Sequence, residues 1–330
     1  MSSPLASMLD VELQPGKPPI LRTETTGDAP GWAAEHRDAL RAVVAEHGAL
    51  LVRGLGLRDA AEVGAVFRRL APSGLMIEKE AFAARQVYAE GVYSSATWPA
   101  NQPMCMHHEL SYRLEVPSLL LFGCLTAPTA GGATAVSDSP TVLEALPKDL
   151  TERFERDGWL LTRSYNDEIG ATVADAFGTE DRAAVESYCR SNAIGFEWQP
   201  DGGLRTWQRR RAVVGHPVTG KRCFFNQIAF LNEWTIDPEV REYLVEMYGE
   251  DGLPFNTGFG SGEPLTAEIV ELINEVYEAN TVREPWQAGD LMLADNIRTA
   301  HSREAYEGSR EILVGMAEPV RLSDASLSNG

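Results

Sequence analysis

Three residues, His107, Glu109 and His301, are of the types that bind a transition metal. His107 and Glu109 form an H-x-E pair in the segment MCMHHELSY, and His301 lies in the segment LADNIRTAHSREAYEG. Two imidazoles and one carboxylate on a single ion leave coordination positions open, and this ligand set lets Fe(II) bind a cosubstrate and activate dioxygen. An oxygenase is therefore the leading hypothesis for this chain.

The spacing of the H-x-E pair selects His107 rather than its neighbour His108. Residues i and i+2 of a strand point to the same face, so His107 and Glu109 can reach one ion while His108 points the other way. The tripeptide alone is a weak signal, because it occurs often by chance and a histidine beside a carboxylate is commonly a surface ion pair. The pair therefore needs a third ligand from elsewhere.

Four further histidines can supply that ligand: His36, His47, His216 and His301. We expect the first two on or at the end of a helix, where a histidine is usually solvated or caps the helix. His216 lies in GHPVTG, a turn between two predicted strands, and is the main competitor. His301 follows the predicted strand GDLMLADN, and functional residues are common at such positions, although a core histidine bonded to backbone would look the same. The residues alone favour His301 and leave His216 open.

Arg310 and Thr134 suggest a site for an anion. Arg310 begins the predicted strand REILVGMAEP, where alternation places it on the apolar face. A guanidinium there needs an anion because an unpaired buried charge is costly, and the carboxylate of a small ligand is a suitable bidentate partner. The hydroxyl of Thr134, in GGATAVSDS, can complete this site. The alternative is an ion pair with a protein carboxylate such as Glu311 or Glu318.

Helices and strands must bring these distant residues together. Residues 1–27 are rich in Pro, Ser and Gly and predict an extended N-terminal arm. Apolar residues at helical spacing then predict a helix that ends near Gly48, the strand ALLVRG, and a second helix that Pro72 ends. We expect these elements to cap the sheet that follows.

The remaining strand signals fall in two blocks. Apolar runs such as SLLLFGCL and GGATAVSDS predict strands between residues 93 and 136, and strand signals return at RRAVVGHP, RCFFNQIAFL, GDLMLAD and REILVGMAEP. Residues from about 141 to 199 are polar and mostly helical in pattern. We predict a mainly β protein with flanking helices: a double-stranded β-helix of the jelly-roll or cupin type, with a helical insertion at 141–199, in one domain over residues 28–330.

Composition and charge exclude several classes of protein. The 330 residues are 44% hydrophobic and 23% charged, as in folded globular domains. A formal net charge of −19 disfavours nucleic acids and anionic membranes as partners. The chain has no long apolar run or signal-peptide pattern, and its four scattered cysteines predict neither disulfides nor a zinc knuckle. We expect a cytoplasmic protein, and the sequence leaves a homo-oligomer open.

Five segments taken together resemble one known family, the taurine dioxygenase-like, 2-oxoglutarate-dependent non-haem iron oxygenases. The likeness runs from about Ala49 to Pro319, and it is closest to the clavaminate synthase-like branch that includes the syringomycin-cluster aspartyl hydroxylase. The segments are MHHELSY, PTAGGATAVSDS, GHPVTGKRCFFNQIAF, WQAGDLMLADN and AHSREAYEGSREILVGM. Their combination is specific, whereas no single segment is.

The resemblance implies a role for each candidate residue. It implies that His107, Glu109 and His301 bind Fe(II), and that Thr134 and Arg310 bind the distal carboxylate of 2-oxoglutarate. It further implies that 2-oxoglutarate and O2 take the open iron positions and that decarboxylation to succinate and CO2 yields an oxidant for the substrate. Hydroxylation is the expected outcome, because relatives that halogenate carry a small residue in place of the carboxylate.

Substrate contacts are harder to predict, since they come from loops and inserted segments. A basic cluster in LRTWQRRR can receive a carboxylate or phosphonate of a small-molecule substrate, or the acidic surface and phosphopantetheine of a carrier protein. The alternative is a solvated edge strand that discourages aggregation. The candidate substrate residues are Arg205, Arg209, Arg210, Arg211, Asn226, Tyr112 and Asn296.

The leading function is an Fe(II)- and 2-oxoglutarate-dependent dioxygenase of specialised metabolism, such as antibiotic biosynthesis. We expect it to hydroxylate an amino acid or amino-acid-derived intermediate, either free or bound to a carrier protein. The alternatives are desaturation, cyclisation or bond cleavage of a small acid with the same cofactors, and a zinc hydrolase built on the same ligands. A cupin-like binding protein without chemistry is a third class, which the complete ligand set disfavours.

Overall fold

The core of the fold is a sheet of eight strands. The computed structural model describes residues 9–24, 27–83, 85–166, 168–200, 202–249 and 252–322. All neighbouring strands of this sheet are antiparallel except β2 and β3, which are parallel. In spatial order the strands are β1 (Val11–Glu12), β2 (Ile20–Arg22), β3 (Ala49–Arg53), β17 (Leu291–Asp295), β7 (Glu115–Thr126), β20 (Glu311–Arg321), β5 (Val92–Ser94) and β4 (Val87–Ala89).

A smaller antiparallel sheet lies against one face of the first. Its order is β16 (Thr281–Val282), β9 (Val136–Asp138), β18 (Thr299–Arg303) and β6 (Met104–His107). One apolar cluster joins the two sheets: it contains Leu120 and Phe122 of β7 as well as Met106 of β6 and Val136 of β9. Two facing sheets around a common core confirm the predicted double-stranded β-helix.

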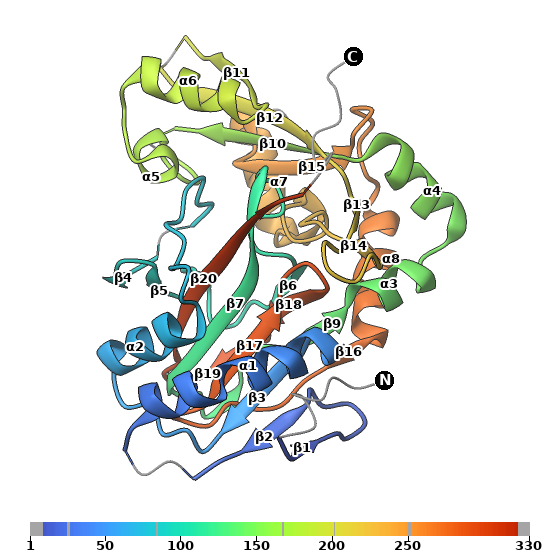
Figure 1. Ribbon diagram of the computed structural model, residues 1–330. Helices are drawn as coiled ribbons and strands as arrows, with labels where there is room; N and C mark the ends of the chain where they lie inside the picture. Colours follow the sequence, from blue (N-terminus) through green and yellow to red (C-terminus); the bar gives the residue numbers. More distant parts are fainter. Residues whose placement is uncertain are drawn as a thin grey trace.

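Two helices cover the other face of the large sheet, and Figure 1 shows one of them beside β3 and β17. They are α1 (Ala29–His47) and α2 (Ala60–Leu70). Asp28 and Asp59 cap their N-termini by accepting backbone N–H bonds, and Gly48 ends α1 with a positive φ of 87°. Strand β7 is therefore buried on both faces, because Leu119 and Leu121 pack under these helices while Leu120 and Phe122 face the small sheet. This double burial explains its unbroken apolar run.

The N-terminal arm is part of the large sheet. Strands β1 and β2 fall within residues 1–27, and β2 pairs with β3 from Ile20↔Leu51 to Arg22↔Arg53. Ile20 and Leu21 are buried in the two apolar clusters. The described part of this segment is extended, as predicted, but it forms the edge of the sheet and is not separate from it. Residues 1–8 lie outside the described part of the chain.

The middle segment, residues 141–199, contains the predicted helices, but it also contains strands that the sequence analysis did not predict. Two strands of a second four-stranded sheet lie among the helices, and the strand order is β11-β12-β10-β15. Trp159, Leu161, Arg163 and Tyr165 are the buried residues of β10, an alternation of period two that indicates a strand. In chain order the segment and its sheet contain α3 (Ser139–Ala145), α4 (Lys148–Asp157), β10 (Trp159–Tyr165), α5 (Val173–Phe177), α6 (Arg182–Ser191), β11 (Gly195–Trp198), β12 (Leu204–Arg210) and β15 (Phe255–Phe259).

Two further short sheets and two helices complete the fold. The predicted strand RCFFNQIAFL ends at Phe224, and its second half is a turn that is also buried. Helices α7 and α8 follow this turn in the chain. These elements are β13 (Val213–Gly215), β14 (Arg222–Phe224), β8 (Ala130–Gly131), β19 (Tyr306–Glu307), the 3-10 turn η2 (Glu233–Thr235), α7 (Pro238–Tyr248) and α8 (Ala267–Ala279).

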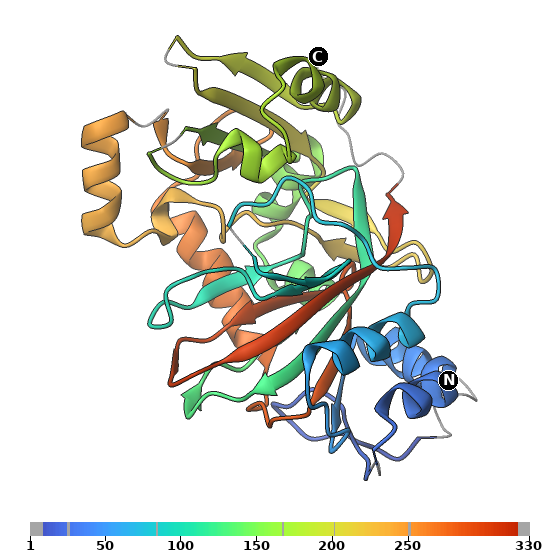
Figure 2. The ribbon, with the colours of Figure 1, turned by 90° about the vertical axis from the view of Figure 1, so that its left-hand side faces the viewer.

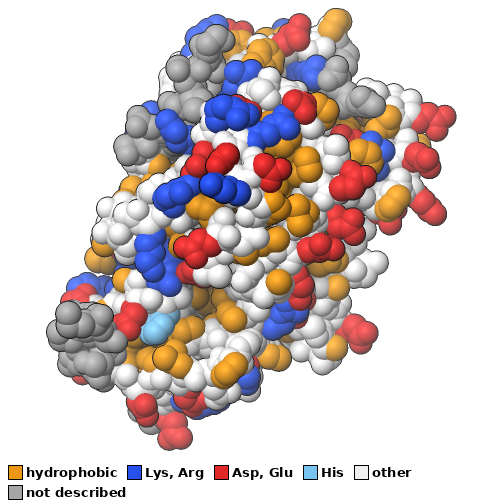
Figure 3. Space-filling view, turned by 90° about the vertical axis from the view of Figure 1, so that its right-hand side faces the viewer, with side chains coloured by type: hydrophobic (Ala, Val, Ile, Leu, Met, Phe, Trp, Pro, Cys, Tyr) orange, Lys and Arg blue, Asp and Glu red, His pale blue; other side chains and the backbone are white. Residues whose placement is uncertain are grey.

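The two ends of the molecule are built from different elements. In Figures 1 and 2 the β10–β12 sheet lies at the top and helices α1 and α2 lie at the bottom, with the facing sheets between them. On the face drawn in Figure 3, acidic and basic side chains are interspersed around apolar ones. Within the described residues, no helix has both the length and the apolar character needed to cross a membrane.

Candidate metal and cosubstrate site

His107 and Glu109 lie where β6 leaves the small sheet. His107 is the last residue of β6, whereas Glu109 is in the turn that follows, so strand alternation does not place both side chains as we had reasoned. The turn directs Glu109 back toward His107, and it continues through Leu110, a non-glycine residue with φ 55°. His107 and Glu109 are 4% and 3% exposed, so an ion held between them is shielded from bulk water.

His301 lies on β18, directly opposite His107. The two residues are register partners in the small sheet, and their ring centroids are 4.2 Å apart. Nε2 of His301 is 3.8 Å from Oε2 of Glu109. One ligand atom from each of the three residues lies within 4.8 Å of the others. We had expected His301 directly after the strand GDLMLADN; it is instead on the next strand, because the chain reverses at residues 296–298.

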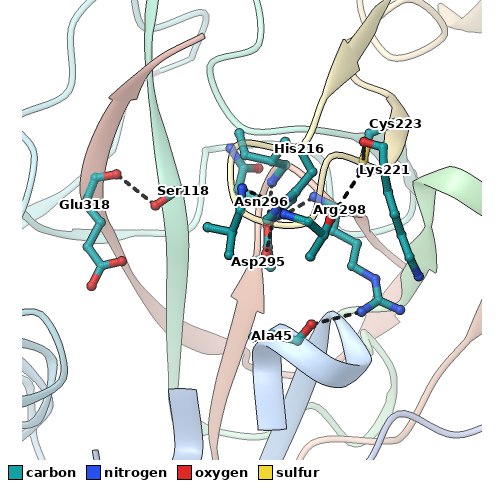
Figure 4. Close-up of polar contacts among 12 residues, drawn as sticks. Ala45, Ser118, His216, Lys221, Cys223, Asp295, Asn296, Arg298 and Glu318 are labelled. Atoms are coloured by element: carbon teal, nitrogen blue, oxygen red, sulfur yellow. Dashed lines mark hydrogen bonds and ion pairs between the residues drawn. The ribbon is translucent and has the colours of Figure 1, made fainter. Parts of the chain in front are cut away.

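His216, the competing histidine, lies elsewhere. Its Nε2 is 2.8 Å from Oδ2 of Asp295, at the end of β17, and its Nδ1 accepts the backbone N–H groups of Val218 and Thr219. Figure 4 shows this pair together with Asn296 and Arg298 in the turn between β17 and β18. Both nitrogens of His216 are therefore engaged in holding turns together.

The protonation of the two cavity histidines suits metal binding. Burial lowers the pKa of His107, although the charge of Glu109 opposes this, and burial lowers the pKa of His301 well below its ordinary value. The neutral imidazole is the form that binds a metal. Nδ1 of His107 is 2.8 Å from the carbonyl oxygen of Cys105, which orients the ring and leaves Nε2 for an ion. Two neutral imidazoles beside a carboxylate fit Fe(II).

Arg310 and Thr134 meet in the same cavity. Nη2 of Arg310 donates to Oγ1 of Thr134 over 3.3 Å, and Nε donates to the carbonyl oxygen of Gly132 over 2.9 Å. Trp286 donates to the same hydroxyl from its Nε1 over 3.1 Å. Thr134 precedes β9, so the loop between β8 and β9 positions it rather than a strand face.

Neither of the two carboxylates that were the alternative partners of Arg310 pairs with it in the structure. Glu311 accepts a hydrogen bond from Tyr88, and Glu318 pairs with Arg41. Burial, together with the nearby charge of Arg303, lowers the pKa of Arg310 to about 10. Because a charged ligand would relieve both effects, this guanidinium is a suitable partner for a carboxylate.

Sequence reasoning missed Arg85 in the cavity wall. Arg85 contacts Glu109, and Ser95 accepts a hydrogen bond from Arg310. These residues precede the H-x-E segment, in a stretch whose sequence shows no clear periodicity. The cavity is lined by Arg85, Ser95, Ala96, Met104, His107, Glu109, Phe122, Thr134, His301, Ser302, Arg303, Arg310 and Val314.

A comparison with protein families identifies the chain. Residues 12–317 match the family described as taurine catabolism dioxygenase TauD, TfdA family. The chain belongs to this family. As a TauD, TfdA family member it is a 2-oxoglutarate-dependent non-haem iron dioxygenase, with Fe(II) as cofactor and 2-oxoglutarate and O2 as cosubstrates.

Two relatives and one solved structure are similar to this TauD, TfdA family member over most of its length. It is 32% identical over 300 residues to the dapdiamide synthesis protein DdaC of Enterobacter agglomerans, which covers 91% of each chain. It is 27% identical over 290 residues to the clavaminate synthase-like protein At3g21360 of Arabidopsis thaliana, covering 84% of each. The structure of PvcB, described as an Fe, alpha-ketoglutarate dependent oxygenase from an isonitrile synthetic pathway, has a TM-score of 0.52 at 18% identity, covering 93% of this chain and 89% of PvcB. This last likeness supports the fold.

Three of the residues predicted to bind the substrate form hydrogen bonds with backbone groups of this TauD, TfdA family member instead. Asn296 bonds to both backbone groups of Glu109, and the hydroxyl of Tyr112 donates to the carbonyl of Glu80 over 2.8 Å. The side-chain oxygen of Asn226 accepts the N–H of Ile228 within the turn after β14. All three are buried outside the cavity wall given above.

The predicted arginine cluster lies on β12 and directly after it. Arg210 is buried and donates to the carbonyl oxygens of Tyr112, Asn192, Ala193 and Arg209. Arg205, Arg209 and Arg211 are half-buried. The structure therefore does not bring this cluster into the cavity that contains His107 and Arg310.

Proposed function

We propose that His107, Glu109 and His301 hold Fe(II), and that Arg310 and Thr134 hold the distal carboxylate of 2-oxoglutarate. One observation carries the assignment: the three possible ligands and the Arg310–Thr134 pair line a single buried cavity. When bound, Fe(II) and 2-oxoglutarate supply the activation of dioxygen that oxidises a substrate, and the cosubstrate becomes succinate and CO2.

The chain's own residues orient the cosubstrate and exclude water. Arg310 and Trp286 both donate to the hydroxyl of Thr134, so this oxygen accepts two bonds and can give its own proton to a carboxylate. Phe122 and Val314 contribute apolar side chains to the wall of this cavity. A cavity with such walls strengthens the charge interactions inside it and protects reactive species from hydrolysis.

We further propose that the enzyme hydroxylates an amino acid or an amino-acid-derived intermediate in specialised metabolism. The similarity to a dapdiamide synthesis protein over 91% of each chain supports this class of pathway. The carboxylate Glu109 supports hydroxylation over halogenation, since a halide needs the position that a carboxylate ligand fills. A screen by mass spectrometry for a product heavier by one oxygen atom, with free amino acids and carrier-bound aminoacyl groups side by side, tests the proposal.

The iron assignment has a direct test against the zinc hydrolase alternative. Anaerobic protein with Fe(II) and 2-oxoglutarate should show a metal-to-ligand charge-transfer band, and His107→Ala should abolish it. Turnover should consume dioxygen and release succinate in equal amounts. A protein that hydrolyses its substrate without oxygen, or that keeps full activity as His107→Ala, would contradict the assignment.

The substrate has a second possible form, an aminoacyl group bound to a carrier protein. One surface of the chain is suited to such a carrier. Arg205, Trp207 and Arg209 share the outer face of β12, and Trp207 is 42% exposed. An aromatic side chain between arginines suits an acidic carrier protein. If only carrier-bound groups react, the double reversal Arg205→Glu with Arg209→Glu should raise KM for the carrier and leave kcat nearly unchanged. Equal turnover of free and carrier-bound groups would exclude a docking role.

A further inference from the structure

Arg85 is a buried cation in the wall of the cavity, and the proposed iron and cosubstrate roles do not use it. Its side chain is 5% exposed, and its Nη2 is 3.2 Å from each carboxylate oxygen of Glu109. Its Nε is 3.1 Å from Oε1 of Glu78. The residue belongs to the segment between α2 and β4, which lies outside both facing sheets.

The bonding of this guanidinium is incomplete. Its Nε is buried and makes no hydrogen bond of good geometry to the described residues, although a guanidinium carries five N–H donors. Burial opposes its charge, but the carboxylates of Glu109 and Glu78 raise the pKa of Arg85 above its ordinary value. Arg85 is therefore a charged residue of the cavity lining, and its Nη1 forms no hydrogen bond with the described residues.

The two other arginines of the cavity have defined partners. Arg310 belongs to the proposed cosubstrate site with Thr134. Arg303 donates to three backbone carbonyls, those of Trp98, Pro99 and Gln102. Of the three cavity guanidiniums, Arg85 is the one next to an iron ligand, and a substrate must bind near the iron.

Glu109 would be shared between two cations once a metal is bound. Its carboxylate oxygens lie 3.2 Å from Nη2 of Arg85, and the same side chain belongs to the proposed iron site. One carboxylate cannot neutralise both cations, and an unpaired charge in a cavity shielded from water is costly. A further anion beside Arg85 would therefore stabilise the site.

We propose that Arg85 anchors a single carboxylate of the substrate beside the iron. This inference rests on the proposed function and narrows its substrate class to compounds that keep one free carboxylate close to the oxidised carbon. The planar guanidinium offers a carboxylate two parallel N–H bonds, and Glu109 fixes its position relative to the metal.

Calorimetric titration of the full chain, loaded anaerobically with Mn(II) and 2-oxoglutarate, tests the proposal without turnover. The probes are the twenty protein L-amino acids and their fully amidated counterparts. At least one acid should bind at least tenfold more tightly than its amide. Arg85→Met should abolish that preference, and Arg85→Lys should keep part of it, because lysine retains the charge without the bidentate geometry.

Arg241→Met is the matched control, since Arg241 of α7 forms a partly buried pair with Glu233 of η2 and neither residue lines the cavity. It should leave the acid preference unchanged. The proposal is overturned if no acid binds more tightly than its amide, or if Arg85→Met keeps the preference. It is also overturned if Arg85→Met loses Mn(II) itself, since Arg85 would then only hold Glu109. A wild-type protein that fails to bind 2-oxoglutarate with the metal would instead refute the proposed function.

Discussion

The side-chain amide of Asn296 satisfies both backbone groups of Glu109. Its Oδ1 accepts the N–H of Glu109 over 2.8 Å, and its Nδ2 donates to the carbonyl oxygen of Glu109 over 3.0 Å and to that of Pro117 over 2.8 Å. Asn296 begins the turn between β17 and β18, which leads to His301. The amide of Asn296 therefore connects the turn that carries Glu109 with the turn that precedes His301.

Asn296→Ala should weaken metal binding without removing a ligand. The turn that carries Glu109 is outside the strands, so the amide replaces the ladder bonds that would otherwise fix it. Loss of an outer-shell support of this kind typically weakens metal affinity about 10- to 100-fold. Anaerobic Fe(II) titration, followed by the charge-transfer band, measures the effect. Asn280→Ala, which removes a bond to a carbonyl at the end of α8, is the control and should leave the Fe(II) affinity unchanged.

The sequence was sufficient to predict the strands of the facing sheets because their burial left a local pattern. The unbroken apolar run of β7 is an example, since neighbouring positions of that strand are buried on both faces. By contrast, Glu109 was reasoned to be on a strand although it lies in a turn, since periodicity does not reveal where a strand ends.

The substrate side could not be predicted in the same way. Arg210 and Asn296 have the chemical types of binding residues, yet both bond to backbone groups far along the chain, and such bonds leave no local signal. Arg85 gave no signal either, because its role follows from its distance to Glu109 and not from its neighbours in sequence. Tertiary contacts decide these assignments.

Thr134→Val should raise the KM for 2-oxoglutarate more than it lowers kcat. The valine keeps the shape of the side chain but leaves Nη2 of Arg310 and Nε1 of Trp286 without this acceptor. A hydrogen bond to a charged group contributes about 1.5–3 kcal/mol, which corresponds to a loss of affinity of roughly 10- to 100-fold. Thr134→Ser, which keeps the hydroxyl, should stay close to wild type. Equal kinetics of the valine and serine variants would contradict this role for Thr134.

The stability of the metal-free protein should fall as the pH is lowered below about 6.5, in part because of His108. Burial lowers the pKa of His108 to about 3. Its Nδ1 accepts the N–H of Asn226, and its Nε2 is 2.6 Å from Oγ of Ser139, so the neutral ring is fully bonded. A histidine whose pKa is lower in the folded state adds stability that is complete above the unfolded pKa of about 6.5 and is lost as the pH falls toward the folded value.

Urea unfolding at several pH values measures this dependence. Between pH 6.5 and 5, His108 alone should reduce the free energy of unfolding by about 2 kcal/mol, at ~1.4 kcal/mol per pH unit and proton. His108→Gln should be less stable at neutral pH but should show a shallower pH slope. A variant with the same slope as wild type would show that other groups cause the acid sensitivity.

Arg210→Met should destabilise the fold and leave substrate recognition intact, contrary to the role that sequence reasoning gave this residue. Arg210 joins β12 to the turn at Tyr112 and to the end of α6 through bonds to backbone carbonyls. Removing it takes one donor from each of these carbonyls, although that of Tyr112 keeps its bond from Gln208, and the expected cost is about 1–3 kcal/mol. Urea unfolding should show this loss, while the KM for 2-oxoglutarate stays within about twofold of wild type.

Arg58→Met, which removes an exposed arginine on the surface, should change the free energy of unfolding by less than about 0.5 kcal/mol. Because the guanidinium of Arg210 is 2% exposed and turned into the protein, a selective rise in KM would mean that this end of the molecule opens during binding.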